Sequence, residues 1–469
     1  MALKTDILTS FPPVDESMVD ALLGKEIEKN HKKIVVLDDD PTGVQTVHDI
    51  SVYTNWSKDS IARGFAEENK LFYILTNSAQ TEAAHKEIAA NVDAVAKDFG
   101  QEYLFISRSD STLRGHYPLE TVILKEAYEK NTGKKIDGEI MCPFFKEGGR
   151  FTIHDIHYVK YGDELVPAAE TEFARDKTFG YHFSDIKAYV EEKTKGEYKK
   201  ENVTSIALED LRAMSLDKIE QQLLSVENFN KIVVNAIDYV DVKIFCIALY
   251  RAMSKGKNFM FRTAAAIVKV MGGVTDQPLL TREQMVVKET ANGGIIVVGS
   301  HTEKTTRQVD MLRENPDIAF VELDASLVKQ EEAFAAEVDR CLALEEKYLA
   351  EGTTVCVYTT RTLITADTGD KEDELKLSVK ISDAVQSLVG RLSIVPSFVI
   401  AKGGITSSDV GTKALAVQRA NVLGQIKPGI PVWQTGEESK FPLTPYVIFP
   451  GNVGEISTLK EAAEILMYK

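Results

Sequence analysis

The sequence predicts an α/β protein of two domains, each with a mostly parallel sheet flanked by helices. Short β-branched runs alternate with longer amphipathic stretches over most of the chain. A chain of 469 residues is too long for one ordinary hydrophobic core. The apolar fraction of 44% and the charged fraction of 27% are typical of a globular protein in water. No apolar run approaches the roughly 18 residues that a membrane span needs.

The N-terminal domain is expected to span residues 1–275, with a helical extension at 1–30. Two stretches have apolar residues at helical spacing, 81–100 and 240–255, and the first of them ends on a glycine. The strands expected in this domain are 33–38, 49–54, 71–76, 103–107, 231–236 and 258–262.

The C-terminal domain is expected to span residues 294–469, after a linker at 276–293 where glycines are frequent and periodicity is weak. The strands expected here are 294–300, 353–360, 397–404 and 446–452. The helices expected between or after them are 303–314, 329–350, 372–392, 406–420 and 457–467.

Composition excludes several classes of partner. Acidic residues outnumber basic ones by 71 to 55, which gives a net charge of −16, so we expect neither nucleic acid nor an anionic membrane as a partner.

The four cysteines are scattered without a CxxC pair and are expected to be reduced thiols. The N-terminal residues do not resemble a secretory signal, which predicts a cytoplasmic protein.

Polar residues follow several expected strands, where open α/β sheets bind their ligands. In the first domain these are the acids of "VVLDDDPTGV" (35–44) and the group "SRSDSTLRG" (107–115). In the second domain, glycine-rich turns at 403–404 and 451 are suited to binding phosphate through backbone N–H groups. Neither turn matches the Walker pattern, so a P-loop ATPase is not expected.

The stretch "SRSDSTLRG" allows two interpretations. Asp110 and Arg114 are four residues apart with small hydroxyl residues between them, and Arg108 adds a second cation. Such a loop can bind a small polyol carboxylate, because arginine pairs with the carboxylate and aspartate accepts hydroxyl protons. The same spacing also fits a salt-bridged helix start capped by Ser109 or Asp110. The nearby histidines lack the spacing of a metal site, so the sequence does not identify any side chain as a metal ligand.

A Mg²⁺-dependent phosphatase is the alternative reading of the acidic triplet. "VVLDDDPTG" fits the opening motif hhhhDxDxT of haloacid-dehalogenase-like phosphatases through Asp38, Asp40 and Thr42. Those enzymes also need a lysine and an acidic pair after a strand, and the candidate stretch 233–241 has the wrong spacing. This reading also leaves "SDSTLRG" and the second domain without a role.

Several motifs together resemble those of the four-carbon acid sugar kinases. Asp39-Asp40-Pro-Thr-Gly is similar to their opening motif, and "RSDSTLRG" differs from a second motif only in Arg108, where lysine is usual. The later stretches that resemble the family are "PFFKEGGR" (143–150), "VVGSHTEKTTRQV" (297–309), "KGGITSSDV" (402–410), "GQIKPGIPVW" (424–433) and "FPGNVG" (449–454). Phe449 in place of a usual lysine, and Arg262 in place of small residues, indicate a divergent member whose acid is larger or differently charged than a tetronate.

The resemblance implies an ATP-dependent kinase that phosphorylates a terminal hydroxyl of a tetronate or 3-oxo-tetronate in carbohydrate catabolism. Its active site would lie in the interdomain cleft, with Mg²⁺ on the phosphates, and dimers are common among such enzymes, so a homodimer is one assembly to expect. The base would be Asp39, with Asp40 and Asp110 as rivals. The sugar acid would be bound by Arg108, Asp110, Ser111, Arg114 and Arg150. The nucleotide would be bound by Ser300, Gly403, Gly404, Ile405, Thr406, Gly451 and Asn452.

Overall fold

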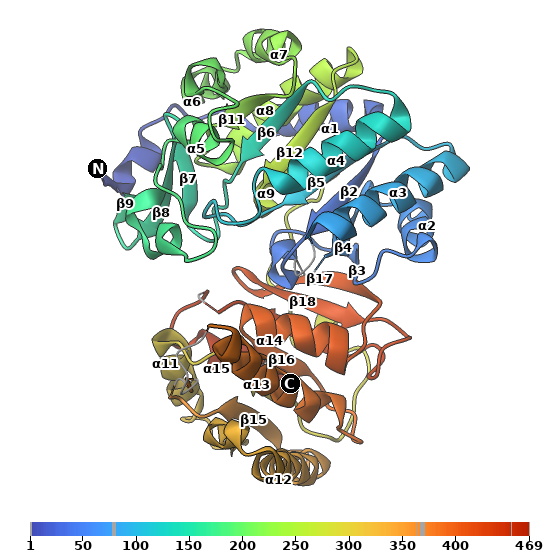
Figure 1. Ribbon diagram of the computed structural model, residues 1–469, viewed down its shortest axis with the longest axis vertical. Helices are drawn as coiled ribbons and strands as arrows, with labels where there is room; N and C mark the ends of the chain where they lie inside the picture. The colour runs from blue at the N-terminus through green and yellow to red at the C-terminus, as the bar shows by residue number, and fades with distance from the viewer. Residues whose placement is uncertain (1, 77–80, 363, 366–370, 452, 469) are drawn as a thin grey trace. The chain divides into compact units, whose positions relative to one another are not determined.

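The computed structural model describes residues 2–76, 81–362, 364–365, 371–451 and 453–468, and it confirms the predicted α/β class (Figure 1). The chain divides into two compact units. Unit 1 contains Met1–Asp39 and Asn55–Asp276, and unit 2 contains Asp40–Thr54 and Gln277–Lys469. The second unit therefore takes a short segment from the N-terminal half of the chain.

Unit 1 is built on a parallel sheet of seven strands in the order β10-β11-β6-β12-β5-β2-β4. The strands are β2 (Lys33–Asp38), β4 (Leu71–Leu75), β5 (Tyr103–Arg108), β6 (Gly138–Cys142), β10 (Thr204–Ile206), β11 (Asn230–Val234) and β12 (Phe259–Thr263). The strands β2, β4, β5, β6 and β12 are buried along their whole length, as expected of a parallel sheet covered on both faces. All carboxyl ends lie at one edge, and that edge carries Asp38, Asp39 and the segment 107–115.

Two groups of helices cover this sheet (Figure 1). One group is α2 (Lys58–Ala66), α3 (Thr81–Phe99) and α4 (Leu119–Thr132). The other is α1 (Glu16–Lys29), α6 (Leu208–Arg212), α7 (Leu216–Ser225), α8 (Tyr239–Ser254) and α9 (Ala265–Gly272).

A small antiparallel sheet in the order β1-β9-β8-β7 belongs to unit 1. Its strands are β1 (Leu3–Lys4), β7 (Arg150–Ile153), β8 (Ile156–Tyr161) and β9 (Glu164–Pro167), and α5 (Ile186–Lys193) follows. Buried residues of this region, such as Val159, Tyr181 and Tyr189, share a core cluster with Leu113 and Tyr117. The small sheet and α5 therefore pack against the loop that carries the "SDSTLRG" motif.

Unit 2 contains a mixed sheet in the order β3-β17-β18-β19-β16-β13-β15-β14. β19, β16, β13, β15 and β14 are parallel, whereas β3, β17 and β18 are antiparallel. The strands are β3 (Ile50–Tyr53), β13 (Ile295–Val298), β14 (Ile318–Leu323), β15 (Thr354–Thr359), β16 (Val399–Lys402), β17 (Arg419–Lys427), β18 (Ile430–Thr435) and β19 (Pro445–Phe449).

The helices of unit 2 are α10 (Arg282–Met285), α11 (Glu303–Leu312), α12 (Glu331–Ala350), α13 (Lys371–Gly390), α14 (Gly404–Asp409) and α15 (Thr458–Met467). A π-helical turn, Val410–Ala414, follows α14. A short 3-10 helix, η2 (Pro41–Val44), comes from the N-terminal segment and contacts α14, β18 and β19.

The expected strands and most of the expected helices are confirmed, but one stretch that was expected to be helical is partly a strand. The helix expected over 406–420 is wrong in its second part, because helical structure ends at Ala414 and β17 begins at Arg419. The strands that were not expected are β6, β10, β14, β17 and β18 and the four strands of the small antiparallel sheet, β1, β7, β8 and β9. Buried and partly buried residues alternate along β17, as in a strand with one buried face, but Gly424 takes one of the buried positions and interrupts the apolar alternation in the sequence.

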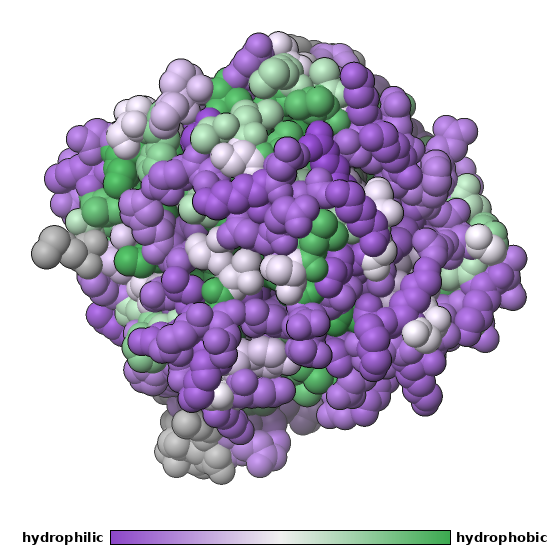
Figure 2. All heavy atoms as spheres, turned by 90° about the horizontal axis from the view of Figure 1, so that it is seen from above, coloured by the Kyte–Doolittle hydropathy of each residue, from purple (hydrophilic) through white to green (hydrophobic). Residues whose placement is uncertain are grey.

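No helix of the described chain is long and apolar enough to cross a membrane. The face of the molecule shown in Figure 2 is covered mainly by hydrophilic residues, and apolar residues gather there in small separate groups.

Candidate functional site

The acidic triplet begins where β2 ends, next to an arginine of the neighbouring strand. Asp38 and Arg108 are the last residues of β2 and β5 and are paired in register. Their side chains form a buried ion pair, with Asp38 2% and Arg108 9% exposed. Arg108 Nη2 also lies 3.5 Å from Asp39 Oδ1. Arg108 is therefore a counter-charge for the acids of the first motif, and little of it is exposed to a substrate.

The segment 107–115, which contains the last two residues of β5 and the loop that follows, is fixed by hydrogen bonds from buried side chains to its backbone. Four successive carbonyl groups, those of residues 111–114, each accept at least one such bond. His157 Nε2 lies 2.7 Å from Ser111 O, and Tyr181 Oη lies 2.6 Å from Thr112 O. Tyr189 Oη lies 2.8 Å from Leu113 O, and Arg262 Nη2 lies 2.9 Å from Arg114 O. Such a loop can hold its polar side chains in place without help from a ligand.

His157 shows how closely this loop is held. Burial lowers the pKa of His157 to about 4, so its ring is neutral near pH 7. Its Nδ1 lies 3.0 Å from the hydroxyl of Thr152, which leaves Nε2 to donate to the Ser111 carbonyl. Nothing in the sequence pattern singled out His157 for this role, because its partner lies 46 residues away in the chain.

Asp110 and Arg114 form the ion pair that the sequence spacing allowed. Arg114 Nε lies 3.0 Å from Asp110 Oδ2, and Nη2 lies 3.2 Å from Oδ1. Asp110 also accepts hydrogen bonds from the backbone N–H groups of Thr112 and Arg114. Burial opposes ionisation of Asp110, but Arg114 and these donors outweigh it and lower the pKa of the carboxyl group. Asp110 is therefore an ionised acceptor at neutral pH.

Arg150, at the start of β7, lies close to this pair. The guanidinium groups of Arg114 and Arg150 are each 5.2 Å from the centroid of the Phe173 ring. Arg150 donates through Nη1 to the carbonyl of Gly148, while its buried Nε has no hydrogen-bond partner among the described residues. Burial lowers the pKa of Arg150, and Arg114 acts in the same direction. Two arginines held on one aromatic ring form a local cationic site in an otherwise acidic protein.

Arg262 has a structural role that corrects the interpretation given to it from the sequence. We expected Arg262 to reflect a larger or differently charged acid. The residue is instead 2% exposed, donates to the carbonyl of Arg114, and lies over the ring of Tyr117 at 5.0 Å. The guanidinium group of Arg262 is used to bind the loop backbone, so the presence of this arginine gives no information about the size of the substrate.

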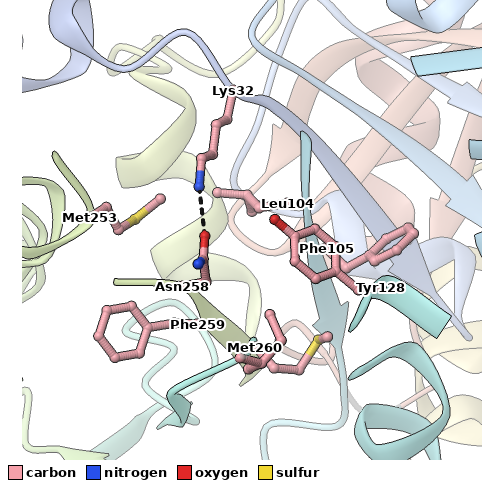
Figure 3. A pocket seen from close by; sticks show the side chains of 9 residues that line it. Lys32, Leu104, Phe105, Tyr128, Met253, Asn258, Phe259 and Met260 are labelled. Atoms are coloured by element: carbon pink, nitrogen blue, oxygen red, sulfur yellow. Dashed lines mark hydrogen bonds between the residues drawn. The ribbon is translucent and has the colours of Figure 1, made fainter. Parts of the chain in front are cut away.

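A small hollow at the carboxyl edge of β2, β4 and β5 is lined by residues of unit 1. These are Leu37, Asp39, Thr76, His85, Ser107, Arg108 and Glu120. A second hollow lies at the opposite edge of the sheet (Figure 3), where Lys32 Nζ donates to Asn258 Oδ1 at 3.0 Å. Its other lining residues are Leu104, Phe105, Tyr128, Ile136, Met253, Phe259 and Met260. Because this lining is mostly apolar, we interpret the second hollow as a packing gap.

In unit 2, Ser300 and the glycine turn after β16 lie together at the carboxyl edge of the parallel strands. The Ser300 hydroxyl lies 3.4 Å from the hydroxyls of Thr302 and Thr305, at the start of α11. Gly403 has a φ of +115°, which side chains rarely allow, and a β-carbon there would lie 3.4 Å from the β-carbon of Ser300. Thr406 is buried beside the same turn.

The remaining residues expected at the nucleotide are placed as follows. Ile405 is 75% exposed beside the glycine turn, although it is a large apolar residue. Gly451 follows β19 and has open space in the direction of a β-carbon. Asn452 lies outside the described residues.

Asp40 belongs to unit 2, although Asp39 belongs to unit 1. Asp40 caps η2 by accepting from the N–H of Thr42 at 2.8 Å. Its Oδ2 lies 3.8 Å from the point where a β-carbon on Gly404 would stand. The two neighbouring acids are therefore associated with different units, which the sequence analysis did not distinguish.

Two cations of unit 2 were not expected from the sequence. Arg361 donates to the carbonyl of Ser300 at 2.7 Å and to the hydroxyl of Thr359 at 3.0 Å. Lys402, the last residue of β16, is fully buried and donates to the carbonyls of Pro450 and Gly451. In sequence, Lys402 could have been noticed as a lysine at the end of an otherwise apolar strand.

Within the described part of the chain, no group of three or more histidine, cysteine, aspartate or glutamate side chains could hold a metal ion. Mg²⁺ at a phosphate site is often bound through one or two carboxylates together with phosphate oxygens. Asp40 beside the glycine turn fits that requirement for one carboxylate.

Two domain families match this chain. A family described as a sugar-binding N-terminal domain matches residues 34–271, and one described as a nucleotide-binding C-terminal domain matches residues 295–459. No curated protein matches the chain.

Solved structures with similar folds support the architecture. A Haemophilus influenzae protein of the DUF1537 family is similar with a TM-score of 0.60 and 16% identity, covering 92% of this chain and 100% of that chain. A Salmonella typhimurium LT2 protein, provisionally described as a tRNA synthase, is similar with a TM-score of 0.65 and 16% identity, covering 92% and 98%. At such identities the likeness bears on the fold alone.

Proposed function

Because the chain belongs to the four-carbon acid sugar kinase family, we propose that it transfers the γ-phosphoryl group of ATP to a terminal hydroxyl of a short sugar acid. The substrate would be a tetronate or 3-oxo-tetronate, and the reaction would belong to carbohydrate catabolism. The observation that supports this best is the loop 107–115 of the sugar-binding unit. Buried side chains fix its backbone, and it presents an ionised aspartate and an arginine at one place.

The sugar acid would be recognised by charge and by hydrogen bonds. Arg114 is already paired with Asp110, whereas Arg150 has a buried Nε without a partner among the described residues. Arg150 is therefore the better candidate to bind the carboxylate, with Arg114 beside it. Asp110 and Ser111 would then orient the hydroxyl groups, because an ionised carboxylate accepts hydrogen bonds from them.

The nucleotide phosphates would lie at the turns that follow β16 and β19 in unit 2. The positive φ of Gly403 and the open space at Gly451 allow a ligand to approach the backbone closely. Ser300 and Thr406 supply hydroxyl groups near the first of these turns. Ile405 is exposed where it could contact an apolar part of the nucleotide.

The two acids of the opening motif would then have different tasks. Asp39, beside Arg108 in unit 1, would accept the proton of the attacking hydroxyl as the new O–P bond forms and the bond from the γ-phosphorus to ADP breaks. Asp40, beside Gly404, would hold Mg²⁺. The metal would neutralise charge on the phosphate oxygens.

The phosphatase alternative finds no support in the geometry. It requires Asp38 as a nucleophile or metal ligand that can reach a phosphate group. Asp38 is 2% exposed and is paired with Arg108 in a buried ion pair.

The test is an assay of ATP consumption over tetronates, pentonates and their oxo forms. We expect turnover with at least one of these acids, and a loss of about 10²–10⁴-fold in kcat for Asp39→Asn, because that change removes the base but keeps the shape. Asp40→Asn should instead raise the Mg²⁺ concentration needed for nucleotide binding.

Two outcomes would contradict the proposal. One is phosphate release from phospho-sugars without ATP, together with no ATP consumption on any acid, which would favour the phosphatase. The other is unchanged turnover in Asp39→Asn, which would exclude that residue as the base.

A further inference from the structure

Lys402 occupies an unusual place for a lysine. It ends β16, it is fully buried, and it is paired in register with Phe449 of β19 and Val298 of β13. Its Nζ donates to the carbonyls of Pro450 at 2.7 Å and Gly451 at 3.1 Å. The ring of Phe449 lies 4.3 Å from the same nitrogen. The lysine thus lies behind the turn that follows β19.

We propose that Lys402 is a positioning residue of the nucleotide site. Its hydrogen bonds hold the 450–451 turn, and its ammonium group places a positive charge beneath this turn, where bound phosphate groups stabilise that charge. This inference rests on the proposed function, because it takes that turn as part of the phosphate site. Lys402 acts through the turn and through space and need not touch the nucleotide.

The charge of Lys402 is sensitive to its surroundings. Burial lowers the pKa of Lys402 to about 7, and Lys304 of α11, a like charge, acts in the same direction. The residues in register on the neighbouring strands, Val298 and Phe449, carry no charge to oppose this. A neutral amine can still donate both hydrogen bonds to the turn. A bound polyphosphate would favour the ammonium form, so nucleotide binding should be accompanied by proton uptake.

Another buried lysine offers a matched comparison. Lys33 begins β2, at the opposite end of its strand from the expected ligand edge, and it donates to the carbonyls of Glu67 and Asn69. Burial lowers the pKa of Lys33 to about 8. Lys33 therefore resembles Lys402 in its burial and in donating to two backbone carbonyls. It differs in that it lies in unit 1 and its acceptors are not part of a turn proposed to bind phosphate.

The experiment is calorimetric titration of the full-length protein with ADP and Mg²⁺ near pH 8, in two buffers of different ionisation enthalpy. At about that pH the nucleotide phosphates are fully ionised, so a difference between buffers reports protons taken up by the protein. We expect the wild type to take up a substantial fraction of one proton for each ADP bound. Affinity should fall as the pH rises through the free pKa of Lys402, because the bound form favours the proton.

The variants separate charge from structure. Lys402→Met should lose the proton uptake and weaken ADP binding by roughly tenfold or more, since a charged hydrogen bond is lost. Lys402→Arg should keep most of the affinity and also lose the uptake, because guanidinium does not titrate in this range. Lys33→Met should keep both affinity and uptake. Thermal unfolding of each variant shows whether it is folded.

The same proton uptake in Lys402→Met as in the wild type would overturn the inference and leave the proposed function intact. Equal uptake in Lys402→Arg would overturn it as well, even if Lys402→Met did not fold. A wild type that binds no ADP would overturn the proposed nucleotide site and this inference together.

Discussion

Single buried side chains fix the backbone of the loop proposed to bind the sugar acid. Arg262 is the clearest case, because it connects a strand end of the sheet to the carbonyls of Leu113 and Arg114. Its guanidinium also lies over the rings of Tyr117 and Tyr189. We therefore expect Arg262 to influence substrate binding through the loop, without direct contact with the substrate.

Arg262→Met should therefore raise KM for the sugar acid by about tenfold or more and leave ADP affinity unchanged. The reason is that two buried carbonyls lose a charged donor, which costs about 1.5–3 kcal/mol, and the loop that carries Asp110 and Arg114 loosens. Steady-state kinetics and ADP titration measure the two effects. The control is Arg212→Met, which breaks the ion pair of Arg212 with the buried Asp241 in unit 1. If both variants raise KM equally, the effect is one of general stability.

At the scale of one element, α12 contains two adjacent glutamates in opposite situations. Glu345 is fully buried, and neither of its carboxylate oxygens has a hydrogen-bond partner among the described residues. Burial raises the pKa of Glu345 well above its usual value, and Glu346 adds to this. Glu346 accepts from the N–H and hydroxyl of Ser393, which lowers the pKa of Glu346.

Glu345→Met should stabilise the protein at neutral pH by about 1–3 kcal/mol, the usual cost of a buried polar group without a hydrogen-bond partner. The carboxyl group that it removes must also take up a proton for the protein to fold. The gain should shrink as the pH falls toward the ordinary glutamate pKa, since the unfolded state then binds the proton too. Glu346→Gln should instead lower the free energy of unfolding at neutral pH, and this loss of stability should become smaller in acid. Urea unfolding at several pH values measures both. A Glu345→Met variant no more stable than the wild type at any pH would contradict this account.

At the scale of the whole molecule, segment 40–54 makes unit 2 depend on the N-terminal half of the chain. β3 pairs with β17 from Ile50 to Tyr53, and the N–H of Asp49 donates to Val422 O at 2.6 Å. Val52 is buried opposite Ala420. The same segment carries Asp40 to the glycine turn.

Val52→Pro should consequently damage the nucleotide-binding unit, although it lies in the N-terminal sequence. Proline disturbs the backbone of a paired strand and removes a buried valine side chain. We expect hydrogen exchange in β17 and β18 to accelerate and ADP affinity to fall. Protection in β2 and β5, which belong to unit 1, serves as the internal control and should not change. Loss of protection in all four strands would indicate global unfolding instead.

Local patterns in the sequence predicted much of the fold and part of the candidate site. Apolar periodicity predicted the central strands β2, β5 and β16, and the residues that follow them gave the candidate site. The spacing of Asp110 and Arg114 allowed their ion pair, which was one of the two interpretations of this stretch, because a separation of four residues brings two side chains together in a tight loop. The supporting side chains of that loop, such as His157 and Tyr189, gave no signal, since their partners lie many residues away.

Short stretches of sequence were enough to predict the α/β class, the resemblance to a kinase family and the strand ends at which polar residues gather. These follow from periodicity and from runs of neighbouring residues, which are properties of short stretches of chain. The tertiary structure alone decided that Arg108 neutralises Asp38, that Asp39 and Asp40 belong to different units, and that Lys402 lies buried under a glycine turn. Burial and pairing depend on contacts between distant residues, and those contacts set the charge and the reach of each group.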